Sequence, residues 1–82
     1  MNDTDQIEIK ADVTDEATIL APKGEIDLSR APSLGHHLTS AQDKKPARLI
    51  VDLAGVPYMD SSGVATLVAA MQVARRQGGK IV

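Results

Sequence analysis

The chain has 82 residues, which is enough for one domain with a small core and too few for two. Its formal charge is −2, from 9 basic and 11 acidic residues, so neither a nucleic acid nor an anionic membrane is an expected partner. It has no cysteine, which excludes disulfides and thiolate metal sites. The acidic N-terminus is unlike a signal peptide and no apolar run reaches the roughly 20 residues of a membrane span, so we expect a cytoplasmic protein.

The first elements indicate a β-hairpin. Apolar and charged residues alternate over residues 6–13, which predicts a half-buried strand. Its inner face would carry Ile7, Ile9, Ala11 and Val13. Residues 14–16 supply turn chemistry, and residues 17–21 have the composition of the returning strand. Pro22 and Gly24 interrupt that strand, after which pairing can resume briefly.

A helix is predicted next, starting near Ser29 and ending at residues 43–46. Asp27 and Ser29 are candidate caps, and Pro32 fits only in the first turn, where its missing N–H costs little. The apolar residues with helical spacing are Ala31, Leu34, Leu38 and Ala41. The nearly continuous apolar run at residues 49–53 then predicts a central strand covered on both faces, in a parallel or mixed sheet.

Residues 62–77 form the clearest helix of the sequence. Arg75 and Arg76 suit the last turn of a helix, and Gly78 can supply a left-handed cap. The predicted buried stripe consists of Val64, Leu67, Val68, Met71 and Ala74. Residues 80–82 have the composition of the start of another strand.

Asp60, Ser61 and Ser62 directly precede this helix, at the carboxyl end of the predicted central strand, where open α/β sheets expose functional residues. One interpretation is that they only cap the helix. The other is that one hydroxyl is modified, because two hydroxyls exceed what a cap needs and Gly63 would leave the first turn bare for another protein. A phosphate on Ser61 would add about −1.5 to −2 charges beside Asp60, which we expect to repel a docked partner and leave the fold intact. Asp60 would orient Ser61 for an external kinase.

Catalytic and metal-binding alternatives find little support. His36 and His37 are adjacent, so on a helix they point to different faces, and a third metal ligand at useful spacing is missing. Ser61 has no G-x-S-x-G elbow around it, and no glycine-rich phosphate loop accompanies Asp60. We therefore expect no enzyme, no catalytic residue, no metal and no cofactor.

Residues 51–82, VDLAGVPYMDSSGVATLVAAMQVARRQGGKIV, resemble the anti-sigma factor antagonist (anti-anti-sigma) family, whose members carry a STAS domain. The shared features are the strand VDL, the aromatic residue and Met before the DSSG motif, the long apolar helix and the GGKIV restart. Upstream, KGEIDLSRAPSL resembles the family's second strand and its entry to the first helix. The resemblance covers about residues 7–82. It implies a STAS-like α/β fold, with a mixed sheet of four to five strands and helices packed on it. The final strand and helices would be lacking, so residues 1–82 would form a single incomplete STAS domain.

The resemblance also implies a bacterial regulatory module that binds an anti-sigma factor and so frees a sigma factor for transcription. In that family the first Ser after the motif Asp is the phosphoacceptor, which corresponds to Ser61, and Asp27 matches an acidic position near it. The expected neighbours of the phosphosite on the partner-binding surface are Met59, Asp60, Ser62 and Gly63. The anti-sigma factor is often itself the serine kinase, using ATP and magnesium, and a PP2C-type phosphatase reverses the mark.

Two further alternatives stay open. The chain could instead resemble a STAS subunit of a membrane lipid-transport ABC complex, which acts as a structural or regulatory binding module. A homodimer is the other open alternative.

Overall fold

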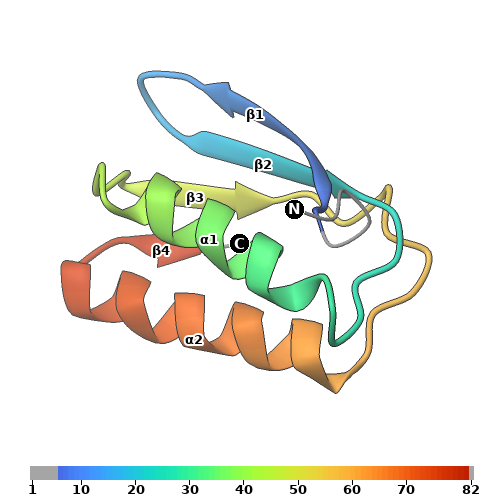
Figure 1. Cartoon of the computed structure of the whole chain (residues 1–82). Helices are drawn as coiled ribbons and strands as arrows, with labels where there is room; N and C mark the ends of the chain where they lie inside the picture. The colour runs from blue at the N-terminus through green and yellow to red at the C-terminus, as the bar shows by residue number, and fades with distance from the viewer. Residues whose placement is uncertain (1–5, 82) are drawn as a thin grey trace.

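The computed structural model describes residues 6–81 and places two helices on one face of a four-stranded sheet (Figure 1). In chain order the elements are β1 (Glu8–Val13), β2 (Thr18–Lys23), α1 (Ala31–Gln42), β3 (Arg48–Val51), α2 (Ser61–Gln77) and β4 (Lys80–Ile81). The strand order is β1-β2-β3-β4, with β1 antiparallel to β2 and the other neighbours parallel. The predicted mixed α/β sheet with packed helices is therefore confirmed, and Val82 lies outside the described residues.

The hairpin is shifted from the predicted bounds: its first strand begins at Glu8 rather than at residue 6, and its second strand runs further than predicted. The Thr14 hydroxyl accepts hydrogen bonds from the backbone N–H groups of Glu16 and Ala17 and so closes the turn. The second strand then continues through Pro22 to Lys23. Pro22 is tolerated because its nitrogen faces the β3 side of the strand, where the β2–β3 pairing has already ended at Leu20. On the predicted inner face of β1, Ile7 is buried but Val13 is 65% exposed, since β1 lies at the edge of the sheet.

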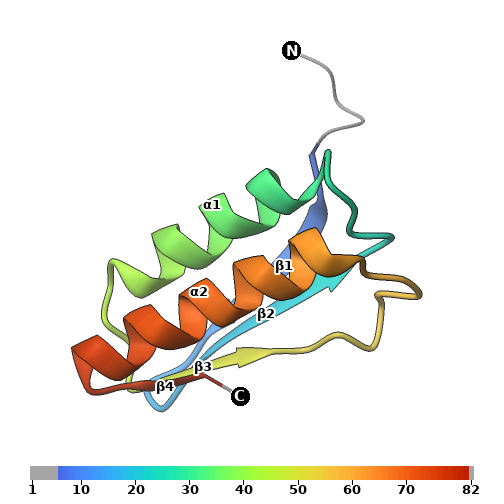
Figure 2. The same ribbon diagram turned by 90° about the horizontal axis from the view of Figure 1, so that it is seen from below.

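The prediction that the central strand is covered on both faces was wrong. Both helices lie over the same face of the sheet (Figure 2). Each crossover moves the chain one strand along in the same direction, and right-handed crossovers then put both helices on one side. Leu49 faces the helices and is buried, whereas its neighbour Arg48 is exposed. Among residues 6–81, no helix covers the opposite face.

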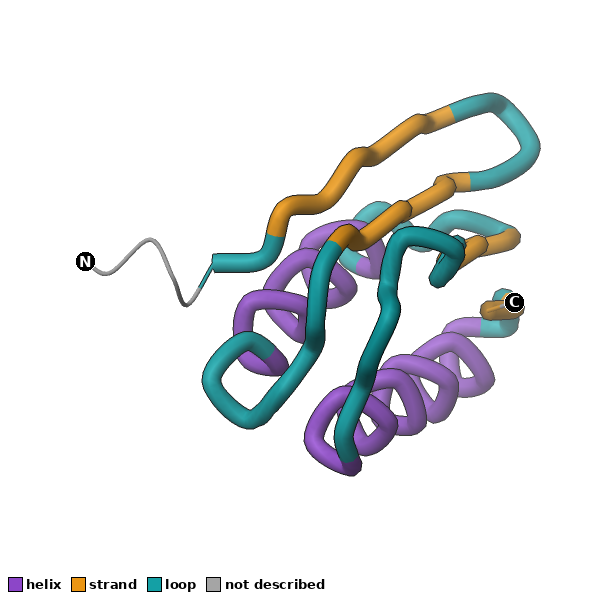
Figure 3. The backbone as a smooth tube through the Cα atoms, turned by 90° about the vertical axis from the view of Figure 1, so that its right-hand side faces the viewer, coloured by secondary structure: helices purple, strands orange, loops and turns teal. Residues whose placement is uncertain are grey.

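At the carboxyl ends of β2 and β3, the two loops run side by side to the starts of the helices (Figure 3). The first helix begins at Ala31, two residues later than predicted, because Asp27 organises a turn over residues 27–30 before the helix. The second helix begins at Ser61, one residue earlier than predicted. Gly78 ends it with φ +78°, which confirms the predicted left-handed cap.

Helix α2 buries its small residues and only part of the predicted apolar stripe, since Ala74 is buried and Leu67 is half-buried against the core. The buried positions are Gly63, Ala70 and Ala74, whereas Val64, Val68 and Met71 are 52%, 46% and 48% exposed. Small residues let α2 come close to α1 and to the sheet, where large side chains from the other elements fill the space. The core consists of Ile7, Leu20, Ile26, Ala31, Leu34, Leu38, Leu49 and Ala70.

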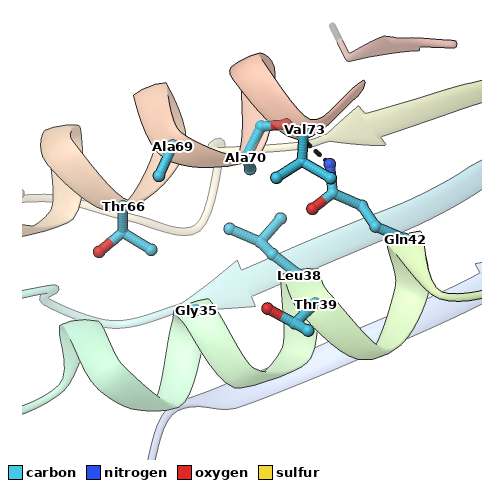
Figure 4. Close-up of a pocket in the computed structure, with 8 residues that line it drawn as sticks. All are labelled: Gly35, Leu38, Thr39, Gln42, Thr66, Ala69, Ala70 and Val73. Carbon is cyan, nitrogen blue, oxygen red and sulfur yellow. Dashed lines mark hydrogen bonds between the residues drawn. The ribbon is translucent and has the colours of Figure 1, made fainter. Parts of the chain in front are cut away.

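A buried polar contact joins the two helices (Figure 4). Gln42, at the end of α1, donates from Nε2 to the backbone carbonyl of Ala70 on α2 at 2.7 Å. Leu38 lies in the same interface and is almost fully buried. Because a buried amide is costly without a partner, this bond helps to fix how far α2 can slide along α1.

Candidate functional site

The candidate site lies where the loops after β2 and β3 meet (Figure 3). Ile26 and Met59 form a short parallel bridge between the two loops. Two backbone hydrogen bonds hold it, from Ile26 N to Tyr58 O at 3.0 Å and from Asp60 N to Ile26 O at 3.1 Å. Because residues that follow a parallel pair advance together, Asp27 and Asp60 leave this bridge next to each other. The fold thus brings together two acidic residues that are far apart in the sequence.

Asp60 caps α2, as the sequence predicted. Its Oδ1 atom accepts hydrogen bonds from Ser62 N at 2.9 Å and Gly63 N at 3.4 Å, while its backbone is extended. The carboxylate also lies at the positive end of the helix dipole. The Asp60 side chain alone therefore caps α2, and the cap needs neither the Ser61 nor the Ser62 hydroxyl.

Ser61 is the first residue of α2 and is exposed. Its hydroxyl makes no hydrogen bond to any residue between 6 and 81. The expectation that Asp60 orients the Ser61 hydroxyl is not met, because the bound carboxylate oxygen of Asp60 is directed to the backbone of the next two residues. Ser62 is half-buried, and its carbonyl accepts a bond from the Thr66 hydroxyl at 2.9 Å. Of the two serines, Ser61 is the more accessible.

Gly63 has a different role from the one expected. It is buried, and a Cβ atom added there would come within 2.5 Å of Met59 Cγ and 2.9 Å of Ile26 Cγ2. Those distances are too short for real carbon contacts, so the glycine lets α2 sit directly on the bridge between the loops. Met59 is half-buried and packs against the core. Gly63 and Met59 therefore pack beneath the candidate site. Gly63 does not expose the backbone of the first turn to another protein.

Asp27 is held as a carboxylate. The Ser29 hydroxyl donates to its Oδ1 atom at 2.9 Å, and the backbone N–H groups of Arg30 and Ser29 donate to the same oxygen at 3.1 Å. These bonds, the Ser29 hydroxyl first, lower the pKa of Asp27 against the smaller opposing effect of desolvation. The carboxylate of Asp27 is therefore stabilised by the turn before α1, next to the bridge that leads to Asp60.

Both loops and the first turns of α2 carry exposed apolar side chains. Leu28 is 76% exposed in the first loop and Tyr58 is 55% exposed in the second, and Val64 lies one turn into α2. Exposed large apolar residues that gather at one place are typical of a protein-binding surface. Sequence reasoning missed Leu28, although an apolar residue between Asp27 and Ser29 in a polar segment was a usable signal.

The two histidines lie apart from the candidate site. Residues 6–81 contain no group of three or more His, Cys, Asp or Glu side chains that could hold a metal ion. His36 and His37 lie on α1 with ring centroids 6.2 Å apart, and neither bonds to Asp60 or Ser61. Over the same residues, neither helix has the length and hydropathy to cross a membrane.

Comparison with known sequences supports the family suggested by these features. The STAS domain model matches residues 8–82. The anti-sigma-B factor antagonists of Listeria monocytogenes and Listeria innocua are each 38% identical over 76 residues, which cover 93% of this chain. The chain spans 66% of the length of these curated relatives.

Solved structures show the same fold. An anti-sigma factor antagonist from Mycobacterium paratuberculosis has a TM-score of 0.82 and 27% identity, covering 92% of this chain and 64% of that one. The Bacillus cell fate determinant SpoIIAA in its phosphorylated form has a TM-score of 0.73 and 21% identity, covering 93% of this chain and 68% of that one. At that identity the second likeness is evidence for the fold alone. With its family match, its mixed sheet and its Asp60-capped helix at the carboxyl end of β3, the chain belongs to the STAS domain family.

Proposed function

We propose that this chain is an anti-sigma factor antagonist, which binds an anti-sigma factor and so frees a sigma factor, and that phosphorylation of Ser61 ends the binding. The observation that carries the proposal is the exposed Ser61 hydroxyl at the first position of α2, without a hydrogen bond to the described residues, beside an Asp60 that already performs the capping. The names of the Listeria relatives, at 38% identity, support the same function.

The partner would dock over the meeting point of the two loops. Leu28, Tyr58 and Val64 supply exposed apolar contact area there, and Asp27 and Asp60 supply charge. Protein interfaces take most of their binding free energy from a few large side chains at a desolvated centre. Ser61 would lie within that centre.

Phosphorylation of Ser61 would act on the partner rather than on the fold. The phosphate would lie at the positive end of the α2 dipole, which tolerates negative charge and favours survival of the helix. A docked partner would instead meet about two added negative charges beside two existing carboxylates, together with the cost of desolvating them. The added charge would therefore weaken binding much more than folding.

The chain would supply only the hydroxyl in this reaction. An external kinase, for which the anti-sigma factor itself is the proposed candidate, would transfer the γ-phosphoryl group of ATP to Ser61 Oγ with magnesium, releasing ADP and the hydroxyl proton. A PP2C-type phosphatase would hydrolyse the phosphoserine and restore binding. A structural subunit of a lipid-transport complex has no use for an exposed serine here, and the relatives' names favour the antagonist.

Binding to the anti-sigma factor encoded in the same genome tests the proposal, with isothermal titration calorimetry as the measurement. Ser61→Ala should bind within about twofold of the wild type, because the hydroxyl has no bond to lose, and Ser61→Asp should bind at least about tenfold more weakly. The matched control is Ser40→Asp, which adds the same charge at an exposed hydroxyl position on α1 and should bind like the wild type.

Mass spectrometry after incubation with that anti-sigma factor and magnesium-ATP tests the acceptor directly. The phosphate should be found on Ser61. Phosphate only on Ser62 or on another residue, or equal weakening by Ser40→Asp and Ser61→Asp, would contradict the assignment.

A further inference from the structure

Leu28 is the most exposed large apolar residue among residues 6–81, with a relative exposure of 76%. It lies on the loop after β2, which β3 separates from the β4 edge of the sheet. It is not part of the core, whereas Ile26 on the same loop is fully buried there. A single exposed apolar residue is ordinary on a protein surface, so exposure alone assigns no role to Leu28.

The backbone around Leu28 forms a turn that Asp27 holds closed. The Oδ1 atom of Asp27 accepts three hydrogen bonds, from Ser29 N at 3.1 Å, Ser29 Oγ at 2.9 Å and Arg30 N at 3.1 Å. The backbone carbonyl of Asp27 accepts two more, from Arg30 N at 3.1 Å and Ala31 N at 2.8 Å. None of these bonds involves Leu28, so a polar residue would complete the same turn. The turn therefore fixes the place of an apolar side chain that the turn itself does not need.

Leu28 and the proposed phosphosite occupy corresponding positions on the two loops. Ile26 pairs with Met59 in the short parallel bridge, and Leu28 and Ser61 each lie two residues further along the chain. Both residues are exposed. The two loops run side by side at this end of the sheet (Figure 3). A protein that docks over the bridge can therefore contact Leu28 on one loop and cover Ser61 on the other.

We propose that Leu28 is the apolar anchor of the surface that binds the anti-sigma factor, and that Ser29 is the positioning residue that presents it. The inference rests on the proposed function and adds the kind of partner surface that this function requires. That surface is a pocket for one aliphatic side chain, with basic groups at its rim that face Asp27. A backbone that is fixed before binding loses little conformational freedom on binding, so the closed turn raises what Leu28 contributes to affinity.

Isothermal titration calorimetry with the anti-sigma factor encoded in the same genome tests the anchor. Leu28→Ala should bind at least about tenfold more weakly, because it removes most of the apolar surface offered to the pocket. Leu28→Met keeps an apolar side chain of similar volume and should bind within about threefold of the wild type. The matched control is Val13→Ala, which shortens a 65% exposed apolar side chain at the far end of the β1–β2 hairpin and should bind like the wild type.

Ser29→Ala tests the positioning role, because it removes one bond of the turn and leaves Leu28 in place. It should bind about fivefold more weakly than the wild type, and Ser29→Thr, which keeps the hydroxyl, should restore binding. In a chain that already carries Leu28→Ala, Ser29→Ala should change affinity by less than about twofold, because the side chain that it positions is gone. A carboxyl NMR titration adds a measurement without the partner. The pKa of Asp27 should rise in Ser29→Ala, since the Ser29 hydroxyl is the main cause of its lowered pKa.

The same titrations distinguish the anchor from the phosphorylation switch. Wild-type affinity of Leu28→Ala with weak binding by Ser61→Asp would overturn the anchor and leave the switch. Weak binding by Leu28→Ala with wild-type affinity of Ser61→Asp would support the anchor and contradict the switch. Equal weakening by Leu28→Ala and Val13→Ala would overturn the anchor, and an undiminished effect of Ser29→Ala in the Leu28→Ala chain would overturn the positioning role. A wild-type chain that does not bind the anti-sigma factor would overturn both proposals. Circular dichroism confirms that each variant folds.

Discussion

At the scale of single residues, Asp60 and Ser61 are neighbours with separate tasks. Asp60 directs one carboxylate oxygen to two backbone N–H groups of α2, and Ser61 keeps its hydroxyl at the surface. This division makes the hydroxyl available for chemistry without a cost to the helix, because the cap does not depend on it. Removal of each side chain should therefore affect a different property of the protein.

Asp60→Ala should lower the free energy of unfolding by about 1 kcal/mol, because Ser62 N and Gly63 N lose their acceptor at the start of α2. Urea denaturation followed by circular dichroism measures this. Asp60→Asn is the control that keeps an acceptor oxygen, and it should recover most of the loss. An unchanged midpoint for Asp60→Ala would mean that the cap adds nothing to stability.

At the scale of the elements, α2 comes close to the Ile26–Met59 bridge because Gly63 has no side chain. Gly63 lies directly over Met59 and Ile26, at distances that leave no room for a Cβ atom. A second close approach, at Gly35 on α1, leaves an added Cβ 3.4 Å from Thr66 Cγ2, which is close to an ordinary contact. The two glycines thus differ in what a methyl group would meet.

Gly63→Ala should destabilise the protein by about 1–3 kcal/mol, because the new methyl group must push Met59 or the helix start aside. Gly35→Ala is the matched control, and it should be neutral or stabilise by up to about 1 kcal/mol, since alanine favours the helix. Urea denaturation of both variants measures the two changes in the free energy of unfolding. Equal effects of the two substitutions would show that the contact between α2 and the bridge does not require glycine.

The prediction for the second helix shows what periodicity can and cannot provide. The apolar spacing of residues 64–74 correctly indicated a helix, and Gly78 correctly indicated its end. The spacing indicated the buried face only in part: Ala74 and Leu67 do face the core, whereas Val64, Val68 and Met71 are exposed. Small residues such as Ala70, which allow α1 and the sheet to come close, take their place. Burial was decided by the partner surfaces, which the local sequence does not contain.

At the scale of the whole molecule, the sheet has a protected centre and two weaker edges. The inner strands β2 and β3 have neighbours on both sides, whereas β1 and the short β4 have a neighbour on one side only. Leu20 and Leu49, one on each inner strand, are among the most buried residues. Local opening should therefore begin at the edges.

Native-state hydrogen exchange tests this arrangement. The backbone amides of Leu20 and Leu49 should exchange slowest, near the rate set by global unfolding. The amides of Val13 and Lys80, on the two edge strands, should exchange at least about tenfold faster, because few buried contacts hold them. Equal protection of edge and inner strands would contradict the view that the sheet opens from its edges.

The sequence alone determined the local features of this protein. Alternation over residues 6–13, the period of residues 62–77, the cap at Asp60 and the glycine at residue 78 each depend on neighbours along the chain, so the elements and the position of Ser61 could be predicted. Only the tertiary structure decided that Asp27 and Asp60 follow the same bridge between the loops, that Gly63 faces inward and that Val64, Val68 and Met71 face outward. These facts depend on contacts between residues distant in sequence and on both crossovers lying on one face of the sheet, which no local pattern encodes.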